Sequence, residues 1–178
     1  MATTPKNRIV QSVAPRSIFP EVSALVDATV SYNQGDLLFL DGSLIAPVTG
    51  DADGEFARPH DIEAAADGSI YVVDSGNHRV QVFSAAMKHR ATFGSALKLN
   101  EPKYLHFDGE HVWLADEYNH RILLLDRRHR PLGMLGTGQR GRGPNAFYKP
   151  EAVLARAPFV WVIDTYNDRI VLLRVETP

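Results

Sequence analysis

The chain has 178 residues, of which 44% are apolar, and this size and composition suit one domain or one compact array of repeats. Its 19 basic and 21 acidic residues leave a net charge of −2, so no overall positive field draws nucleic acid or an anionic membrane. The lack of cysteine excludes disulfides, thiolate metal ligands and thiol nucleophiles. The N-terminus lacks the apolar core of a signal peptide and no apolar run is long enough to span a membrane, so we expect a cytoplasmic protein.

The first fifty residues predict short strands. Apolar and β-branched side chains gather in three stretches, which we predict to be strands: residues 21–27, 29–33 and 35–41. The last of them, GDLLFLD, resembles HRILLLD later in the chain. This segment is therefore predicted to be a degenerate copy of a unit that is repeated later in the chain.

A repeated hairpin organises the rest of the chain. Residues 70–83 read IYVVDSGNHRVQVF, in which two apolar runs flank a polar turn, a pattern typical of a β-hairpin. The pattern returns at residues 112–125 and 160–173, and the Asp residues that begin the three turns lie 42 and 48 residues apart. Self-similarity at this period predicts a repeat architecture.

A proline opens each repeat, where a strand loses no ladder hydrogen bond by lacking an N–H. These prolines are Pro20, Pro59, Pro102 and Pro150. They divide a single domain, residues 1–178, into four units: about 17–56, 57–99, 100–147 and 148–178.

Each complete unit is predicted to hold four strands. In the second unit they cover residues 60–66, 69–74, 79–83 and 89–94. In the third unit they cover residues 104–107, 111–116, 121–126 and 131–136. The fourth unit has only three, at residues 151–156, 159–164 and 169–174, so we predict that residues 8–13 supply its outer strand. That strand would close the repeats into a ring and protect the free edges.

These features resemble NHL-repeat β-propellers. The resemblance is carried by the F-x-x-P openings at 56–59 and 147–150, the Asp-Gly turns at 67–68 and 108–109, and the D-x-x-N-x-R turns. It covers about residues 17–178 and implies an all-β propeller whose blades are four-stranded antiparallel sheets. The usual ring of the family has six blades, whereas this chain encodes four, so either one chain closes a small ring or copies share a larger one. The N-terminal strand favours closure within one chain.

A second resemblance involves the N-terminal region. Residues 31–53 are similar to the start of small bacteriophage head-decoration proteins. It implies a virion structural protein with capsid or tail proteins as partners.

The polar turns are interpreted as structural because all three repeats share them. Asp accepts N–H bonds within a turn, Asn tolerates the left-handed region and Arg pairs with a nearby carboxylate or carbonyl. The turn residues are Asp74, Asn77, Arg79, Asp116, Asn119, Arg121, Asp164, Asn167 and Arg169. His78 and His120, in the same turns, are predicted to be exposed residues without a ligand.

Binding is predicted where the repeats differ. The residue after each opening proline is predicted to face the propeller axis: Glu21, His60, Lys103 and Glu151. Peptidyl-hydroxyglycine lyases resemble NHL propellers and hold zinc on histidines of several blades, one of them in a context that Pro59-His60-Asp61 matches. The other three axial positions lack histidine, so we expect neither a zinc site nor an enzyme, and no cofactor.

Two charged loops form the predicted rim of the molecule. The acidic loop carries Asp51, Asp53 and Glu55. The basic residues are Arg127, Arg128, Arg130, Arg140 and Arg142. Few aromatic residues, only Phe147 and Tyr148, stand near these arginines, which argues against RNA, and the opposite charges favour self-association or a protein partner. We therefore expect a non-enzymatic protein-binding or assembly module, with a virion structural protein, an RNA-binding propeller and a lyase as alternatives in that order.

Overall fold

The computed structural model describes residues 8–10, 23–25, 37–38, 44–46 and 49–175. The chain divides into two compact units, Met1–Gly50 and Asp51–Pro178. Within the described residues the helices are three short 3₁₀ turns, and none is long and apolar enough to cross a membrane. The residues that resemble phage proteins lie mostly outside these ranges, so that resemblance stays a prediction.

The first unit contains two small antiparallel sheets. One pairs β1 (Arg8–Val10) with β2 (Ser23–Leu25), and the other pairs β3 (Leu37–Leu38) with β4 (Leu44–Ala46). The prediction that residues 8–13 close the ring is wrong for the described part of that strand, because β1 pairs with β2. Pairing with a strand nearby in the sequence closes a shorter loop and costs less entropy. The predicted strand at 29–33 lies outside the described residues.

The second unit contains three antiparallel sheets. The first holds β5 (Pro59–Ala64), β6 (Ile70–Asp74), β7 (Arg79–Phe83) and β8 (His89–Phe93). The second holds β9 (Pro102–Phe107), β10 (Val112–Asp116), β11 (Arg121–Leu125) and β12 (Pro131–Leu135). The third holds β13 (Ala152–Arg156), β14 (Phe159–Asp164) and β15 (Arg169–Arg174). The all-β, antiparallel prediction is confirmed, but the three sheets of this unit have four, four and three strands, and the described sheets do not form a closed ring of four blades.

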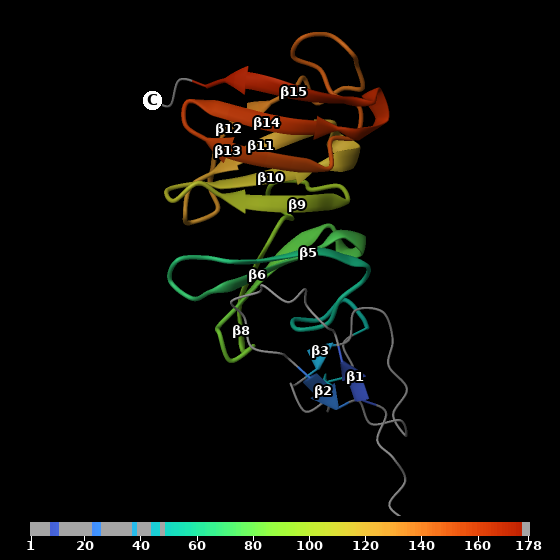
Figure 1. The fold of residues 1–178 in the computed structure, drawn as a ribbon, viewed down its shortest axis with the longest axis vertical. Helices are drawn as coiled ribbons and strands as arrows, with labels where there is room; N and C mark the ends of the chain where they lie inside the picture. The colour runs from blue at the N-terminus through green and yellow to red at the C-terminus, as the bar shows by residue number, and fades with distance from the viewer. Residues whose placement is uncertain (1–7, 11–22, 26–36, 39–43, 47–48, 176–178) are drawn as a thin grey trace, which may run out of the picture. The chain divides into compact units, whose positions relative to one another are not determined.

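The three sheets stack face to face in chain order (Figure 1). One core lies between the first and second sheets and includes Val73, Val80 and Leu114, while a second core, between the second and third sheets, includes Trp113 and Val162. The second sheet is therefore buried on both faces. This explains why β10 and β11 are continuous apolar runs rather than alternating ones.

A 3₁₀ turn joins the second and third strands of every sheet. These turns are η1 (Ser75–Asn77), η2 (Glu117–Asn119) and η3 (Thr165–Asn167). Each ends at a residue in the left-handed conformation: His78, His120 and Asp168, with φ of 55°, 53° and 52°. The repeated sequence thus specifies one repeated turn.

His129 connects the first sheet to the second. It lies between β11 and β12, its ring stacks on Phe93 with the centroids 4.1 Å apart, and a hydrogen bond of 3.0 Å joins its Nε2 to the hydroxyl of Tyr71. Burial lowers the pKa of the His129 imidazole below its ordinary 6.5, against the opposing effect of Asp126. The folded state therefore keeps this ring neutral where the unfolded chain would protonate it.

We expect the free energy of unfolding to fall as the pH falls below about 6.5, because the unfolded chain then binds more protons than the folded one. This contribution is complete above the unfolded pKa and is lost as the pH decreases toward the lower folded pKa. Urea unfolding at pH 7.5 and 5.5 measures it, and His129→Phe should make the two values closer. Arg128→Gln, in the same exposed turn, is the control; an unchanged pH dependence in His129→Phe would contradict the assignment.

Candidate functional site

The Asp of each polar turn is buried and accepts at least three hydrogen bonds. Asp116 is fully buried; its Oδ1 accepts the backbone N–H of Asn100 at 2.8 Å, and its Oδ2 accepts Arg121 Nε at 2.7 Å and Asn119 Nδ2 at 2.9 Å. Asp74 and Asp164 repeat this pattern in the other two sheets. These carboxylates therefore tie each turn to the segment that leads into its sheet, and their burial keeps them away from a ligand in solution.

The arginines of the same turns reach the loops that precede each sheet. Arg121 donates to the carbonyl of Leu97 at 2.7 Å. Arg79 donates to the carbonyls of residues 51, 52 and 55, and Arg169 to those of residues 142, 143 and 146. Guanidinium groups engaged in this way hold loop backbone in place.

His78 is an exposed turn residue, as predicted, whereas His120 is half-buried, and both also connect successive sheets. The Nδ1 of His78 accepts the backbone N–H of Glu101 at 2.9 Å, and that of His120 accepts the N–H of Lys149 at 3.2 Å. Burial, together with Lys149, lowers the pKa of His120, which keeps Nδ1 available as an acceptor. Sequence spacing could not reveal this, because the acceptor and donor lie in different repeats.

Two of the predicted axial residues are in contact. Lys103 donates to Nε2 of His60 at 3.0 Å and forms an ion pair with Glu117 at 3.2 Å. Burial, and next Lys103, lowers the pKa of His60. Glu151 immediately precedes β13, and its backbone N–H donates to the carbonyl of Ile163 at 3.1 Å. Glu21 lies outside the described residues.

Buried Glu117 is the centre of this polar network, although no motif in the sequence marks it. Its carboxylate pairs with Lys103 from its own sheet and, at 3.7 Å, with Lys149 from the segment before the third sheet. The equivalent turn position is Ser75 in the unit 57–99 and Thr165 in the unit 148–178, so alignment alone makes Glu117 a variable turn residue.

Beside this network, three tyrosines and two cations from neighbouring repeats form a tyrosine face. It consists of Tyr118, Arg140, Tyr148, Lys149 and Tyr166. The Lys149 ammonium lies 3.6 Å from the ring centroid of Tyr118 and 4.7 Å from that of Tyr166. The Arg140 guanidinium lies 4.0 Å above Tyr148, whose ring centroid is 5.2 Å from that of Tyr166. Tyr118 and Tyr166 are exposed large aromatic side chains.

The tyrosine face also contains a hollow. An open pocket of about 380 Å³ is lined by Arg140, Arg142, Tyr148, Tyr166 and Asn167, with Gly141. Phe147, which the sequence suggested as a stacking partner, is fully buried instead. Tyr118 and Tyr166 were not predicted as site residues. Their shared position in the turns DEYNHR and DTYNDR is the feature of the sequence that could have identified them.

The predicted basic rim is two separate groups. Arg127, Arg128 and Arg130 lie in the turn between β11 and β12, where Arg130 pairs with Asp126 at 2.6 Å. Arg140 and Arg142 follow β12, whose end pairs with the start of β11 next to η2. The two groups are thus at opposite ends of the second sheet, because one strand separates them.

The acidic loop is held mainly by its own backbone and by the first sheet. The Asp51 carbonyl accepts Arg79, the Asp53 carboxylate accepts the Thr92 hydroxyl at 2.9 Å, and Glu55 accepts the N–H of Ala52 at 3.1 Å. In the described ranges, no group of three or more His, Asp or Glu side chains is arranged to hold a metal ion.

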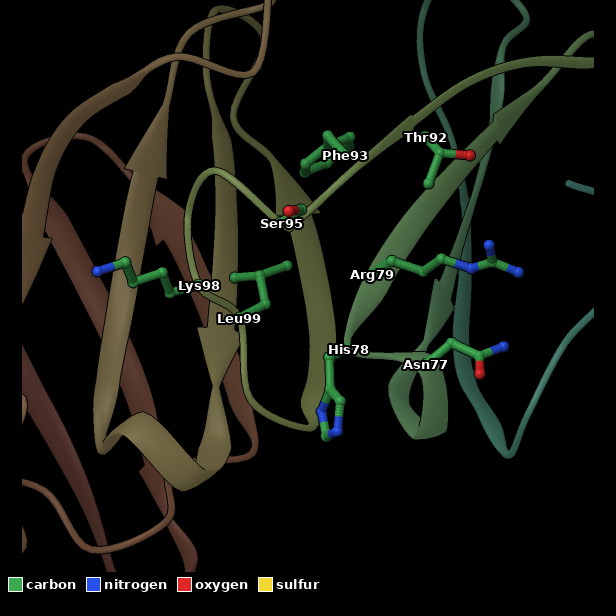
Figure 2. Close-up of a pocket in the computed structure, with 9 residues that line it drawn as sticks. Asn77, His78, Arg79, Thr92, Phe93, Ser95, Lys98 and Leu99 are labelled. Atoms are coloured by element: carbon green, nitrogen blue, oxygen red, sulfur yellow. The ribbon is translucent and has the colours of Figure 1, made fainter. Parts of the chain in front are cut away.

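A second pocket, of about 390 Å³, lies between the first sheet and the segment leading to the second (Figure 2). Figure 2 shows that the long side chains of Arg79 and Lys98 extend away from Ser95 and Leu99, on opposite sides. Because these charged side chains do not point into the pocket, we interpret it as a gap between two packed segments. It is a weaker candidate for a binding site than the tyrosine face.

Comparison with known proteins confirms the repeat. Residues 56–83 match the NHL repeat family. No curated protein sequence matches the chain. Among solved structures, a streptogramin B lyase is similar at 15% identity and a TM-score of 0.50, over 79% of this chain and 47% of that one. An auxiliary nutrient binding protein from Bacteroides thetaiotaomicron VPI-5482 is similar at 16% identity and a TM-score of 0.54, over 74% of this chain and 40% of that one.

These similarities define a propeller-type module that contains an NHL repeat. The chain spans less than half the length of either similar structure. At such low identity the likeness concerns the fold alone, and the lyase activity named for one of them is a property of that protein.

Proposed function

We propose that this protein is a non-enzymatic binding module that takes a segment of another protein on its tyrosine face. The observation that carries the proposal is the row formed by Tyr118, Tyr148 and Tyr166, with Lys149 and Arg140 against the rings. Tyrosine and arginine supply large, rigid contact area with a polar tip, and both are enriched where proteins bind one another.

The charge of the site favours an acidic protein segment. An incoming carboxylate can reach the exposed Arg140 guanidinium while its neighbours pack on the tyrosine rings. A nucleic acid needs several unpaired cations along its backbone. Here Lys103 and Lys149 already pair with Glu117, and Arg58 pairs with Glu101 at 3.0 Å. The balance of charge therefore supports a peptide over RNA, although the exposed tyrosines make RNA the alternative to test.

The experiment uses a phage-displayed library of random peptides with the immobilised protein. The expected result is enrichment of peptides rich in acidic and aromatic residues, with binding weakened at least about tenfold in the double variant Tyr118→Ser/Tyr166→Ser. Tyr104→Ser is the matched control, since Tyr104 is also exposed but lies on β9, outside the tyrosine face.

Two outcomes would overturn the proposal. One is equal enrichment by the wild type and the double variant. The other is filter binding of mixed single-stranded RNA that falls steeply with salt and is lost in the double variant, while no peptide is enriched; that result would assign the face to RNA.

A further inference from the structure

The loop between β12 and β13, which borders the pocket of the tyrosine face, is held by its backbone. Arg169 donates to three carbonyls within residues 142–146, and Asn167 Nδ2 donates to the carbonyl of Gly141 at 2.7 Å. The Gly141 N–H donates in turn to the carbonyl of Phe147 at 3.0 Å. These contacts use main-chain atoms of the loop, so they fix its path without dictating which side chains it carries.

The loop before the first sheet shows that the same contact does not require a basic residue. There, Arg79 Nη1 donates to the carbonyl of Asp51 at 2.6 Å. The equivalent bond before the third sheet joins Arg169 Nη1 to the carbonyl of Arg142 at 2.9 Å. One backbone position thus carries a negative side chain in the first loop and a positive one in the second. The guanidinium of Arg142 is therefore not needed for this contact and is available to bind a ligand.

Two guanidinium groups lie at the pocket without a carboxylate to neutralise them. Arg140 and Arg142 both line this space of about 380 Å³, and none of its lining residues is acidic. Both arginines are exposed, and within the described residues neither guanidinium has an ion pair or a hydrogen bond. By contrast, Arg58 and Arg130 each pair with a carboxylate. The pocket therefore offers two unpaired positive charges to an incoming anion.

The aromatic wall of the pocket is equally well fixed. The Tyr148 N–H donates to Oδ1 of Asp164 at 2.7 Å, and the Tyr166 N–H donates to the carbonyl of Tyr148 at 3.2 Å. The two ring centroids are 5.2 Å apart, and the Arg140 guanidinium lies 4.0 Å from that of Tyr148. A pocket of this volume is larger than one phosphoryl group, and its rings can pack against the ring of a bound side chain.

We propose that this pocket binds a phosphotyrosine of the protein segment that docks on the tyrosine face, an inference that rests on the function proposed above. A phosphate monoester carries nearly two negative charges at pH 7 and accepts forked hydrogen bonds from guanidinium groups. A carboxylate carries only one charge, as does the phosphodiester of a nucleic acid. The pair formed by Arg140 and Arg142 therefore matches the monoester best, and clusters of arginine are a recurring means of recognising it.

Fluorescence anisotropy of the full chain with two labelled peptides tests the proposal. The peptides share one sequence, a single tyrosine flanked by glutamates, and differ only in a phosphate on the tyrosine. We expect the phosphorylated peptide to bind at least about tenfold more tightly, because it adds hydrogen bonds between charged groups. Arg142→Gln should remove most of this gain and leave the unphosphorylated peptide bound as before, since Arg142 is not part of the tyrosine face.

Arg128→Gln is the matched control. It removes the same charge from another exposed arginine, in the turn at the opposite end of the second sheet, and should keep the full gain. Both substitutions leave the backbone contacts of their loops in place, and thermal melting checks that both variants fold. An equal loss of the gain in the two variants would attribute it to overall charge and overturn the proposal.

The remaining outcomes separate this inference from the proposed function. If the unphosphorylated peptide binds and phosphorylation adds nothing, the phosphotyrosine site is wrong and the peptide-binding face stands. If neither peptide binds, the peptide-binding face is contradicted as well. An equal gain from phosphoserine in place of phosphotyrosine would overturn the role of the tyrosine rings. Stronger competition by inorganic phosphate or single-stranded RNA than by unlabelled phosphopeptide would assign the arginines to a free anion or to nucleic acid, which also overturns the proposal.

Discussion

Asp116→Asn is expected to lower the free energy of unfolding by about 3–5 kcal/mol, the usual effect of breaking a buried ion pair on one side. The Asp116 carboxylate is fully buried and accepts Arg121 Nε at 2.7 Å, Asn119 Nδ2 and the N–H of Asn100. An amide at this position removes the charge that Arg121 needs and can place its own NH₂ group against a donor. Urea unfolding followed by tryptophan fluorescence measures the loss.

The matched control is Asp126→Asn. Asp126 also accepts an arginine Nε at 2.7 Å, from Arg130, but this pair lies on the surface and is screened by solvent. The two substitutions remove the same chemistry at the same distance, so the difference between them isolates burial. Equal losses at the two sites would contradict the structural role assigned to the buried Asp.

Gly136→Ala is expected to cost about 2–3 kcal/mol of folding free energy, since it combines backbone strain with a steric clash. Gly136 has φ of 94°, a conformation that a residue with a Cβ rarely adopts. A Cβ there would lie 2.8 Å from the carbonyl oxygen of His120 and 2.8 Å from the fully buried ring of Phe147. Neither neighbour can withdraw cheaply, as one is backbone and the other is packed in the core.

Gly133→Ala, three residues earlier in β12, provides the comparison. A Cβ at Gly133 meets no atom within 4 Å, and its φ is not in the left-handed region. Alanine there should be neutral or slightly stabilising, because glycine loses more conformational freedom on folding. Thermal melting of the two variants measures this difference. Similar changes in melting temperature for both would contradict the importance of the close approach at Gly136.

Much of the second unit could be predicted from the sequence because its signals are local. The predicted strands of the last three repeats agree with β5–β15 to within two residues at each end. Alternating or continuous apolar runs, Asp-Gly turns and opening prolines each determine structure within a few residues. These patterns can therefore be recognised in the sequence without knowing the fold.

The candidate site was less predictable because its residues come together across repeats. Lys149 precedes the third sheet, whereas Tyr118 belongs to a turn of the second and Tyr166 to a turn of the third. For the arginines of the predicted rim, the sequence was misleading in the opposite way, because it placed together residues that the structure separates. They are close in sequence, but β12 carries the chain from one end of the sheet to the other between Arg130 and Arg140.

The sequence by itself determined that this protein contains antiparallel β repeats, one of which matches the NHL family, since a repeated pattern imposes the same turn and the same strands each time. Only the tertiary structure decided which equivalent residues differ in their surroundings. Ile122 and Ile170 occupy one position of the repeat, yet the first is buried by the next sheet and the second is exposed. Burial is a property of the neighbouring sheet, and no pattern within a repeat encodes whether that neighbour exists.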